Sequence, residues 1–277
     1  MKSIHIAASR EYDVLIETGL LSQLGTLAAR QLPGRRAALI SDDAVFPLYG
    51  QQAEQSLQDA GFQTEHFIFP HGEQHKTLAT YGRALNFLCD RRFTREDVII
   101  ALGGGVVGDL AGFTAATYQR GITYIQVPTT LLSMMDSSVG GKTAVDLGDT
   151  KNIVGAFWQP KLVIVDPETL STLPRRHYIN GLAEAVKAGL LADPELFAIF
   201  EKGDIDTQIS EIIYRSLRFK KNVVEQDETE RGMRKALNFG HTIGHGIEAV
   251  KGIKGRRTVG LFHGECVALG MLPMIES

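Results

Sequence analysis

Three histidines lie close together near the end of the sequence. His241 and His245 are four residues apart, so on a helix both rings project from one face, and His263 follows on a later element. Neutral imidazole is the commonest metal ligand in proteins, and a catalytic zinc usually takes three protein ligands. The pattern therefore indicates a metal site, with Glu184 as the candidate acidic ligand. The alternative is that these histidines cap helices or lie at the surface.

Length and charge narrow the possible partners. A chain of 277 residues is expected to form two domains, and its formal charge of -3 provides no general basic field for nucleic acid or an anionic membrane. Residues 1–6 are too weakly apolar for a signal peptide, and no apolar run reaches the length of a membrane span. We therefore expect a cytoplasmic enzyme that acts on a small molecule and binds neither nucleic acid nor membrane.

The two cysteines, Cys89 and Cys266, form no C-x-x-C pair. The sequence therefore indicates neither a disulfide framework nor a cysteine zinc site. We expect both thiols to be reduced, buried and unreactive.

The first part of the chain alternates strand and helix patterns. Residues 36–41 and 64–69 are short apolar runs, and residues 51–60 between them have helical spacing that ends at Gly61. Further buried strands are expected at 97–102, 122–127 and 162–166. This alternation predicts a mostly parallel sheet covered by helices.

Strand patterns fade after Pro174, and residues 181–191 and 205–226 have helical periodicity. The predicted fold class is therefore α/β plus all-α. We expect a Rossmann-like nucleotide-binding domain over residues 1–168 and a helical metal- and substrate-binding domain over residues 169–277.

A glycine-rich loop, Gly103 to Asp109, follows one predicted strand and opens a helix. Its G-x-G-x-x-G pattern lets the backbone approach a pyrophosphate, which the free amides of a helix start would bind. The acidic residue usual about twenty positions later is absent, so Asp42, at the end of an earlier strand, is the candidate ribose ligand. The alternative is a tight turn that binds nothing.

A second glycine segment, Ser137 to Thr143, resembles the end of a phosphate-binding P-loop, but Asp136 stands where that motif needs its first glycine. What remains is a glycine pair that presents Lys142. Basic residues also occur later, at Lys187, Lys220 or Lys221, and Arg234. Ammonium and guanidinium groups match phosphate oxygens, so an acidic substrate would account for them. Taken singly, each could be a solvated surface residue.

The chain closely resembles the 3-dehydroquinate synthase family of sugar-phosphate cyclases, almost from end to end. The resemblance rests on GGGVVGD, TYQRG, VPTTLLSMMDSSVGGKTAVD, KNIVGAF, GLAEAVKAG, DETE and LNFGHTIGH followed by HGE. It implies a nucleotide-binding α/β domain and a helical domain with the active site between them. It also implies NAD and a divalent metal, zinc or cobalt, as cofactors, and a homodimer.

The resemblance also implies roles for individual residues. It places the metal ligands at Glu184, His241 and His263, and makes His245 a substrate-binding residue instead of a ligand. NAD contacts are implied at Asp42, Glu73, Gln74, His75, Lys76, Gly105, Val106, Val107, Gly108, Asp109, Thr129, Thr130, Lys142, Lys151, Thr169, Leu170, Ser171 and Thr172. Substrate and catalytic contacts are implied at Asp136, Lys142, Asn152, Lys187, Lys220, Arg234, Asn238 and His245. Arg120 matches an arginine that reaches the neighbouring subunit's site.

The implied reaction converts 3-deoxy-D-arabino-heptulosonate 7-phosphate into 3-dehydroquinate and phosphate, a step of aromatic amino acid biosynthesis. NAD oxidises one carbinol transiently, phosphate is eliminated, the hydride returns, and an intramolecular aldol reaction closes the ring. Two features depart from the resemblance. The basic stretch 250–258 is longer than it implies, which predicts a longer surface loop, and the helical domain is expected to be incomplete.

Three other functions stay open at this point. A metal-dependent polyol dehydrogenase would release NADH, and the phosphate-binding lysines and Arg234 argue against it. Cyclases that make amino-cyclitol precursors are disfavoured by Asn238 and by the intact Ser-Val-Gly-Gly-Lys-Thr. A catalytically silent NAD-binding protein would bind the cofactor without turnover.

Overall fold

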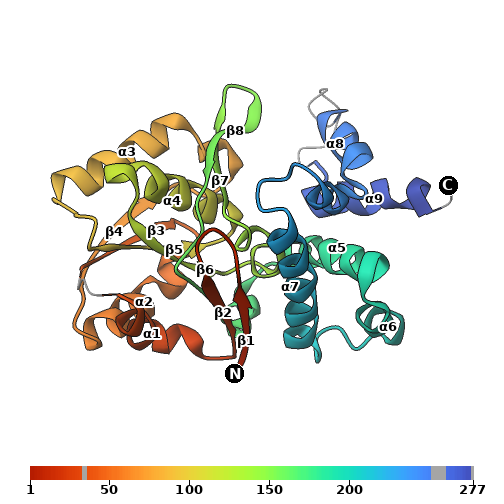
Figure 1. The fold of residues 1–277 in the computed structure, drawn as a ribbon, viewed down its shortest axis with the longest axis horizontal. Coiled ribbons are helices and arrows are strands. Elements are labelled where there is room, and N and C mark those ends of the chain that lie inside the picture. The colour runs from red at the N-terminus through yellow and green to blue at the C-terminus, as the bar shows by residue number, and fades with distance from the viewer. Residues whose placement is uncertain (33–35, 251–259, 276–277) are drawn as a thin grey trace.

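The computed structural model describes residues 1–32, 36–250 and 260–275. An α/β part and a helical part lie side by side, with the β1–β2 hairpin beside helix α7 (Figure 1). The predicted fold class, α/β plus all-α, is confirmed. Within the described residues, no helix is both long and apolar enough to span a membrane.

The α/β part is built on a seven-stranded sheet with the order β1-β2-β9-β6-β5-β3-β4. Its strands are β1 (Lys2–Ile6), β2 (Tyr12–Ile16), β3 (Arg36–Asp42), β4 (Gln63–Phe69), β5 (Val98–Gly103), β6 (Thr123–Pro128) and β9 (Leu162–Val165). All neighbours are parallel except β1 and β2. Strands β5 and β9 are buried along their whole length, which explains their continuous apolar sequences. The prediction of a mostly parallel sheet is confirmed.

Helices cover both faces of this sheet. Helices α1 (Leu24–Gln31) and α2 (Phe46–Asp59) pack in one apolar cluster with the strands, and α3 (Leu78–Asp90) and α4 (Gly105–Thr117) pack in another. Helix α2 begins at Phe46, earlier than the predicted residue 51, because Pro47 suits the first helical turn. A π-helical turn, Ser133–Ser137, follows β6 and leads into the hairpin of β7 (Lys142–Leu147) and β8 (Thr150–Phe157).

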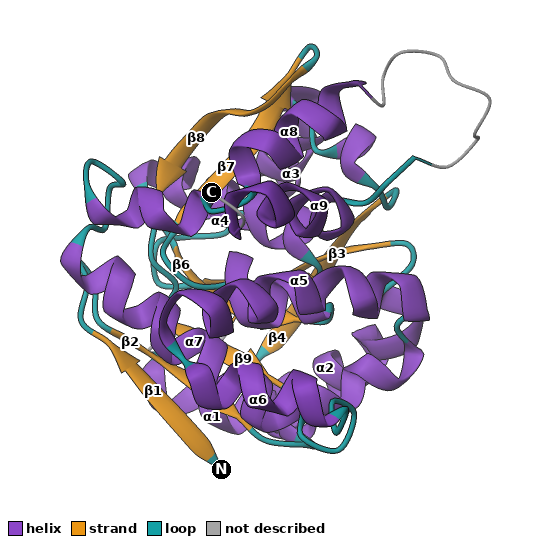
Figure 2. Cartoon of the chain, turned by 90° about the vertical axis from the view of Figure 1, so that its right-hand side faces the viewer, coloured by secondary structure: helices purple, strands orange, loops and turns teal. Residues whose placement is uncertain are grey.

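The helical part begins after the 3-10 helix η5 (Pro167–Thr172). It contains α5 (Arg175–Ala192), α6 (Pro194–Lys202), α7 (Ile209–Gln226), the 3-10 helix η6 (Met233–Asn238), α8 (His241–Val250) and α9 (His263–Ile275), several of which face the viewer in Figure 2. Helix α7 begins at Ile209 instead of the predicted residue 205. Apolar residues of β1, β2 and β9 share one cluster with α5, α6 and α7. The predicted boundary at residues 168 and 169 falls within η5, and the division into two domains stays a prediction.

One expectation about side chains was wrong. Cys266 is buried as expected, but Cys89 is exposed because the last turn of α3 directs Phe87 and Leu88 toward the core and leaves Cys89 outside. The predicted long loop at 250–258 falls almost entirely within residues 251–259, outside the described part of the chain.

Candidate functional site

Three helices bring a carboxylate and two imidazoles together. Glu184 comes from the middle of α5, and His241 and His263 are the first residues of α8 and α9. One candidate ligand atom from each residue lies within 4.8 Å of the others. Among the described residues, the buried Glu184 Oε1 has no hydrogen-bond partner, and it lies 3.6 Å from His241 Nε2. A buried carboxylate oxygen without a partner is costly, so this donor set fits a divalent metal.

The protonation of His241 also suits a metal ligand. Burial, reinforced by the nearby Lys187 ammonium group, lowers the pKa of His241. The neutral imidazole, which is the form that binds metals, is therefore favoured.

His245 lies close to this group without joining it. Its ring centroid is 5.6 Å from that of His241 and 5.7 Å from that of His263. Helical spacing thus places His241 and His245 on one side of α8, but among the described residues the group of possible ligand atoms within 4.8 Å comprises Glu184, His241 and His263, without His245. The division of roles between the two histidines stays a prediction.

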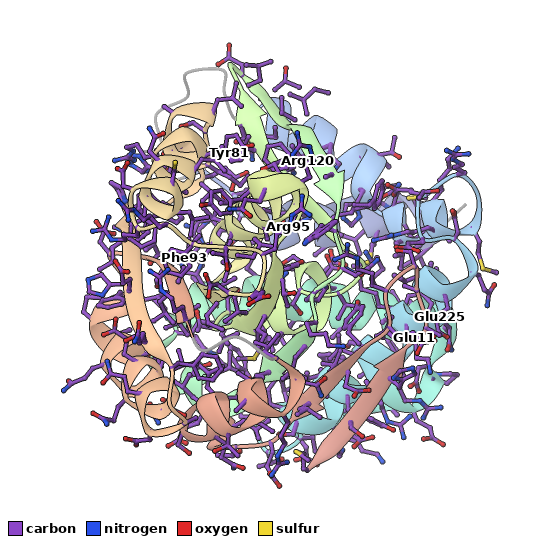
Figure 3. The ribbon with its side chains drawn as sticks, turned by 60° about the vertical axis from the view of Figure 1, so that its left-hand side comes forward. Glu11, Tyr81, Phe93, Arg95, Arg120 and Glu225 are labelled. Atoms are coloured by element: carbon purple, nitrogen blue, oxygen red, sulfur yellow. The ribbon has the colours of Figure 1, made fainter. Side chains whose placement is uncertain are left out.

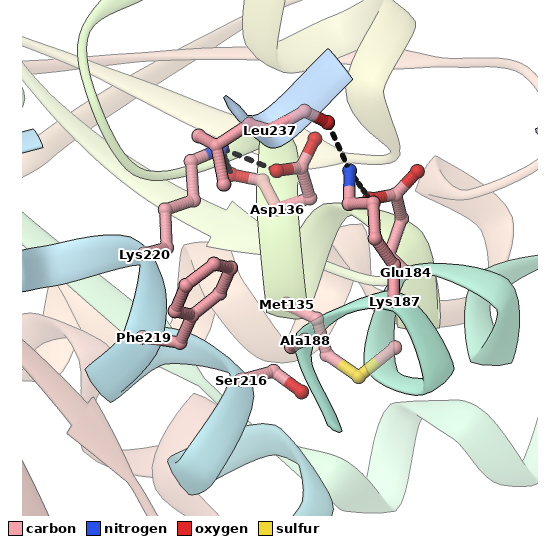
Figure 4. Close-up of a pocket in the computed structure, with 9 residues that line it drawn as sticks. All are labelled: Met135, Asp136, Glu184, Lys187, Ala188, Ser216, Phe219, Lys220 and Leu237. Carbon is pink, nitrogen blue, oxygen red and sulfur yellow. Dashed lines mark hydrogen bonds and ion pairs between the residues drawn. The ribbon is translucent and has the colours of Figure 1, made fainter. Parts of the chain in front are cut away.

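Cationic side chains lie near Glu184, one of the metal-ligand candidates (Figure 4). Lys220 Nζ of α7 donates to Asp136 Oδ1 at 2.6 Å, and Lys187 Nζ of α5 donates to the Leu237 carbonyl at 2.6 Å and pairs with Glu184. These residues line a cavity of about 10 Å³. Burial alone would raise the pKa of Asp136, but the ammonium groups of Lys220 and Lys187 outweigh it and hold the pKa below its usual range.

A larger pocket, of about 510 Å³, shares Asp136 and Lys220 with the small cavity. Five of the predicted substrate-binding residues line it: Asp136, Lys142, Asn152, Lys220 and Arg234. Asp109, a predicted NAD contact, lines it as well. The pocket therefore connects the predicted cofactor and substrate residues.

Arg234 is held in place by backbone carbonyls. Its guanidinium group donates to the carbonyl of Gly140 at 3.1 Å and to that of Glu228, and only 1% of the residue is exposed. Gly140 has φ 99°, and a Cβ there would lie 2.3 Å from Arg234 Nη2. Glycine is required at this position both for the backbone conformation and for the approach of the guanidinium group.

Glu230 is a site residue that the sequence analysis missed. Its carboxylate pairs with Lys142, accepts a 3.4 Å hydrogen bond from Asn238 Nδ2, and lines the large pocket. Its backbone is left-handed, with φ 59°. Glu230 belongs to the DETE motif, but sequence spacing cannot predict its contact with Lys142, which lies 88 residues earlier.

The predicted cofactor side centres on a buried lysine. Lys76 Nζ donates to Asp109 Oδ2 at 3.1 Å and to Asn152 Oδ1 at 2.7 Å, and it lies 3.0 Å from Glu73 Oε1. Burial, reinforced by Glu73 and Asp146 and opposed by Lys76, raises the pKa of Asp109 to about 6. One ammonium group thus joins the predicted NAD contacts to Asn152, a predicted substrate contact.

The other strand-end residues predicted to bind NAD lie at the carboxyl edge of the sheet. Asp42 ends β3 and accepts hydrogen bonds from the amides of Ala44 and Val45 at 3.0 and 2.8 Å. Thr129 follows β6, and its buried hydroxyl has no hydrogen-bond partner in the described structure. Thr130 Oγ1 lies 2.8 Å from Ser133 Oγ. This edge is where open parallel sheets bind nucleotides.

The glycine loop opens α4 as predicted. Gly105 to Asp109 form its start, and the Gly108 amide already donates to the Gly104 carbonyl at 3.0 Å, so only the amides before Gly108 are available to a ligand. The Val107 side chain is buried in the sheet core and that of Val106 packs against it, so Val107 offers a ligand only its backbone. Gln74 and His75 lie on the short 3-10 helix η2 (Glu73–His75).

The residues of η5 predicted to bind NAD have differing surroundings. Thr172 Oγ1 lies 2.5 Å from the Tyr49 hydroxyl, which donates to the Thr169 carbonyl at 2.9 Å. The Ser171 hydroxyl donates to the Glu168 carbonyl, and Leu170 is a core residue. Their assignment as cofactor contacts stays a prediction.

Arg120 and Lys151 do not line the pocket described above. Arg120 is exposed on the α/β part, where Arg95 Nε donates to the neighbouring Gln119 carbonyl at 2.9 Å (Figure 3). Lys151 is exposed in β8. The role predicted for Arg120 requires a second subunit and stays a prediction.

Comparison with known proteins identifies the family of this chain. Residues 66–180 match the family described as 3-dehydroquinate synthase N-terminal, and residues 181–276 match 3-dehydroquinate synthase C-terminal. The chain belongs to the 3-dehydroquinate synthase family. It is 47% identical over 268 residues to the 3-dehydroquinate synthase of Streptococcus mutans serotype c, covering 95% of this chain and 74% of that protein.

Solved structures similar to this 3-dehydroquinate synthase family member include two other synthases. A 2-deoxy-scyllo-inosose synthase complexed with carbaglucose-6-phosphate, NAD+ and Co2+ is 27% identical, with a TM-score of 0.83 over 98% of this chain and 75% of that chain. The 2-epi-5-epi-valiolone synthase ValA of Streptomyces hygroscopicus subsp. jinggangensis, with NAD+ and Zn2+ bound, is 28% identical. Its TM-score is 0.82 over 94% of this chain and 72% of that chain.

Proposed function

We propose that this protein is a carbon–oxygen lyase that converts 3-deoxy-D-arabino-heptulosonate 7-phosphate into 3-dehydroquinate and inorganic phosphate. This is the 3-dehydroquinate synthase step of the shikimate pathway, which leads to chorismate and the aromatic amino acids. Family membership supports the activity. The observation that carries it is the meeting of three buried cations, Lys187, Lys220 and Arg234, beside the donor set of Glu184, His241 and His263.

NAD and a divalent metal are the proposed cofactors, and the structural relatives that contain NAD+ with Co2+ or Zn2+ support both. Glu184, His241 and His263 would hold the metal, and the α4 N-terminus with Asp42 and Lys76 would hold NAD. When bound, the metal would polarise substrate hydroxyls and NAD would accept and later return one hydride, so that no net redox change results.

The proposed role of the cationic residues is to bind the acidic substrate and assist phosphate departure. Lys142, Lys220 and Arg234 line the large pocket and can donate to phosphate or carboxylate oxygens. In the elimination, the carbon–oxygen bond breaks, phosphate leaves with the electron pair, and a phosphate oxygen takes the proton from the neighbouring carbon. The charge on the departing phosphate grows in this step, so prepositioned donors lower the barrier.

The remaining residues would hold the open-chain product in one conformer for ring closure. Asn152 is fixed by Lys76, and Asn238 contacts Glu230, which in turn pairs with Lys142. Fixed amide and carboxylate groups can orient the hydroxyls of a flexible open-chain product until the aldol reaction occurs. We also propose that the protein acts as a homodimer in which Arg120 contributes to the partner's site.

Phosphate release and NADH absorbance, followed together, test the proposal. The zinc-loaded protein with NAD should release phosphate from 3-deoxy-D-arabino-heptulosonate 7-phosphate without accumulating NADH. Accumulated NADH would favour a dehydrogenase, and NAD binding without either signal would indicate a silent binding protein.

His241→Ala sharpens this test. The substitution removes one proposed ligand and should abolish both metal binding and turnover. His66→Ala is the matched control, because His66 is half exposed and pairs with Glu54 on the distant α2. Near-normal turnover by His241→Ala would refute the site assignment.

A further inference from the structure

Helix α5 carries a stripe of polar residues at four-residue spacing. Arg176, Asn180 and Glu184 therefore lie on one side of the helix, facing the start of α9. Glu184 is a proposed metal ligand, but the proposed reaction assigns no role to Arg176 or Asn180. Both contact the segment that carries His263.

Asn180 holds the residue directly after His263. Its Oδ1 accepts a 2.6 Å hydrogen bond from the Gly264 amide, and both residues are buried. A Cβ at Gly264 would lie 1.9 Å from the Asn180 carbonyl oxygen, so glycine is required for α9 to approach α5 this closely. The separation between Glu184 and His263 is thus set partly by a direct backbone approach.

Arg176 holds the residues on either side of His263 through Glu265. Its Nε and Nη2 donate to the two Glu265 oxygens at 2.7 and 2.8 Å, and Nη2 also donates to the Gly260 carbonyl at 2.8 Å. Glu265 Oε2 accepts the Phe262 amide at 2.7 Å, and the Arg176 guanidinium group lies 4.1 Å from the Phe262 ring centroid. This bidentate pairing fixes the relative orientation of Arg176 and Glu265, in addition to the attraction between their opposite charges.

We infer that Arg176, Asn180 and Glu265 are positioning residues. They hold His263 close enough to Glu184 for both side chains to bind one metal ion, and so set the affinity for the catalytic metal. This inference rests on the proposed function, because the metal is part of it. None of the three residues needs to touch substrate or metal. They act by fixing the backbone before and after His263 to the helix that supplies the carboxylate ligand. Residues that orient metal ligands typically change metal affinity by about 10- to 100-fold.

Metal affinity, measured without substrate, tests the inference. Metal-free protein would be titrated with Co2+, following its d–d absorption, and with Zn2+ against a chromophoric chelator. Arg176→Ala and Asn180→Ala should each raise the dissociation constant about tenfold and alter the cobalt spectrum. Arg175→Ala is the matched control, because Arg175 pairs with Asp206 at 3.0 Å at a largely exposed position on the same helix. It should leave the affinity unchanged.

A double-mutant cycle shows whether Arg176 acts through Glu265, its partner beside His263, with all three proposed ligands kept in place. The affinity loss from Arg176→Ala should be much smaller in a Glu265→Gln background than in the wild type. If it persists, the inference is wrong. Should metal-free Asn180→Ala fail to fold by circular dichroism, Arg176→Ala and Glu265→Gln decide, because they alter a partly exposed pair.

The outcomes separate this inference from the proposed function. If folded Arg176→Ala and Asn180→Ala bind Co2+ and Zn2+ as tightly as the wild type does, the inference is overturned and the proposed function is unaffected. Failure of the wild-type protein to bind Co2+ or Zn2+ would overturn both.

Discussion

Two lysine–aspartate pairs border the large pocket, and folding shifts the pKa values of their aspartates in opposite directions. On the predicted cofactor side, Lys76 pairs with Asp109, whose pKa is raised to about 6. On the predicted substrate side, Lys220 pairs with Asp136, whose pKa lies below its usual range. The lysines differ as well, because burial lowers the pKa of Lys220, whereas Asp109 and Glu73 outweigh burial and raise that of Lys76.

The difference comes from the surrounding charges. Burial opposes ionisation in both pairs. Glu73 and Asp146 add negative charge near Asp109, whereas Lys187 and Arg234 add positive charge near the Asp136–Lys220 pair. The two pairs have the same chemistry, so the local excess of charge decides the direction of the shift. On the predicted substrate side the added charges are positive, and an acidic sugar phosphate, the proposed substrate, would balance them.

The largest expected effect comes from breaking the substrate-side pair. Lys220→Met should lower kcat/KM for phosphate release about 100-fold, because removing one partner of a buried charge pair costs about 2–5 kcal/mol and each tenfold corresponds to about 1.4 kcal/mol. The matched control is Lys221→Met, which removes a neighbouring lysine that lies 3.6 Å from Glu225 on the same helix. Equal losses in the two variants would contradict the assignment of Lys220.

Breaking the cofactor-side pair should have a smaller effect. Lys76→Met leaves Asp109 without its cation, and calorimetry should show NAD binding weakened about tenfold, consistent with about 1.5–3 kcal/mol for a hydrogen bond to a charged group. Lys161→Met, at an exposed position, serves as the control. Unchanged NAD affinity in Lys76→Met would show that this pair does not organise the cofactor side.

The smallest expected effect is a change in the pH dependence of stability. The pKa of Asp109 rises from 3.8 to about 6 on folding, so between these values the folded state holds more protons than the unfolded state. Wild-type stability should therefore lose about 1–3 kcal/mol from this group as pH rises from about 4 to about 6. Urea denaturation at several pH values should show that the free energy of unfolding of the wild type falls by this amount relative to that of Asp109→Asn across this range. The same slope in both proteins would contradict the raised pKa.

Local patterns predicted much of the architecture correctly. The apolar runs became β3, β4, β5, β6 and β9, and the glycine loop opens α4 as expected. These features depend on residues near one another in sequence, where side-chain periodicity and helix-start chemistry act. The exposure of Cys89 was not predictable in this way, because it depends on which side of α3 meets the sheet.

The sequence by itself determined the types of chemical group available: imidazoles and a carboxylate for a metal, lysines and an arginine for an acidic substrate, and a glycine loop for a nucleotide. Tertiary structure alone decided which groups meet. Asp136 and Lys220 are 84 residues apart, as are Asn180 and Gly264, and Lys142 and Glu230 are 88 apart. Side-chain periodicity in the sequence relates only residues that are near one another along the chain. The electrostatic field at a buried group, in contrast, is the sum over charges on every element packed around it. For this reason the opposite pKa shifts of Asp109 and Asp136 emerge only in the folded protein.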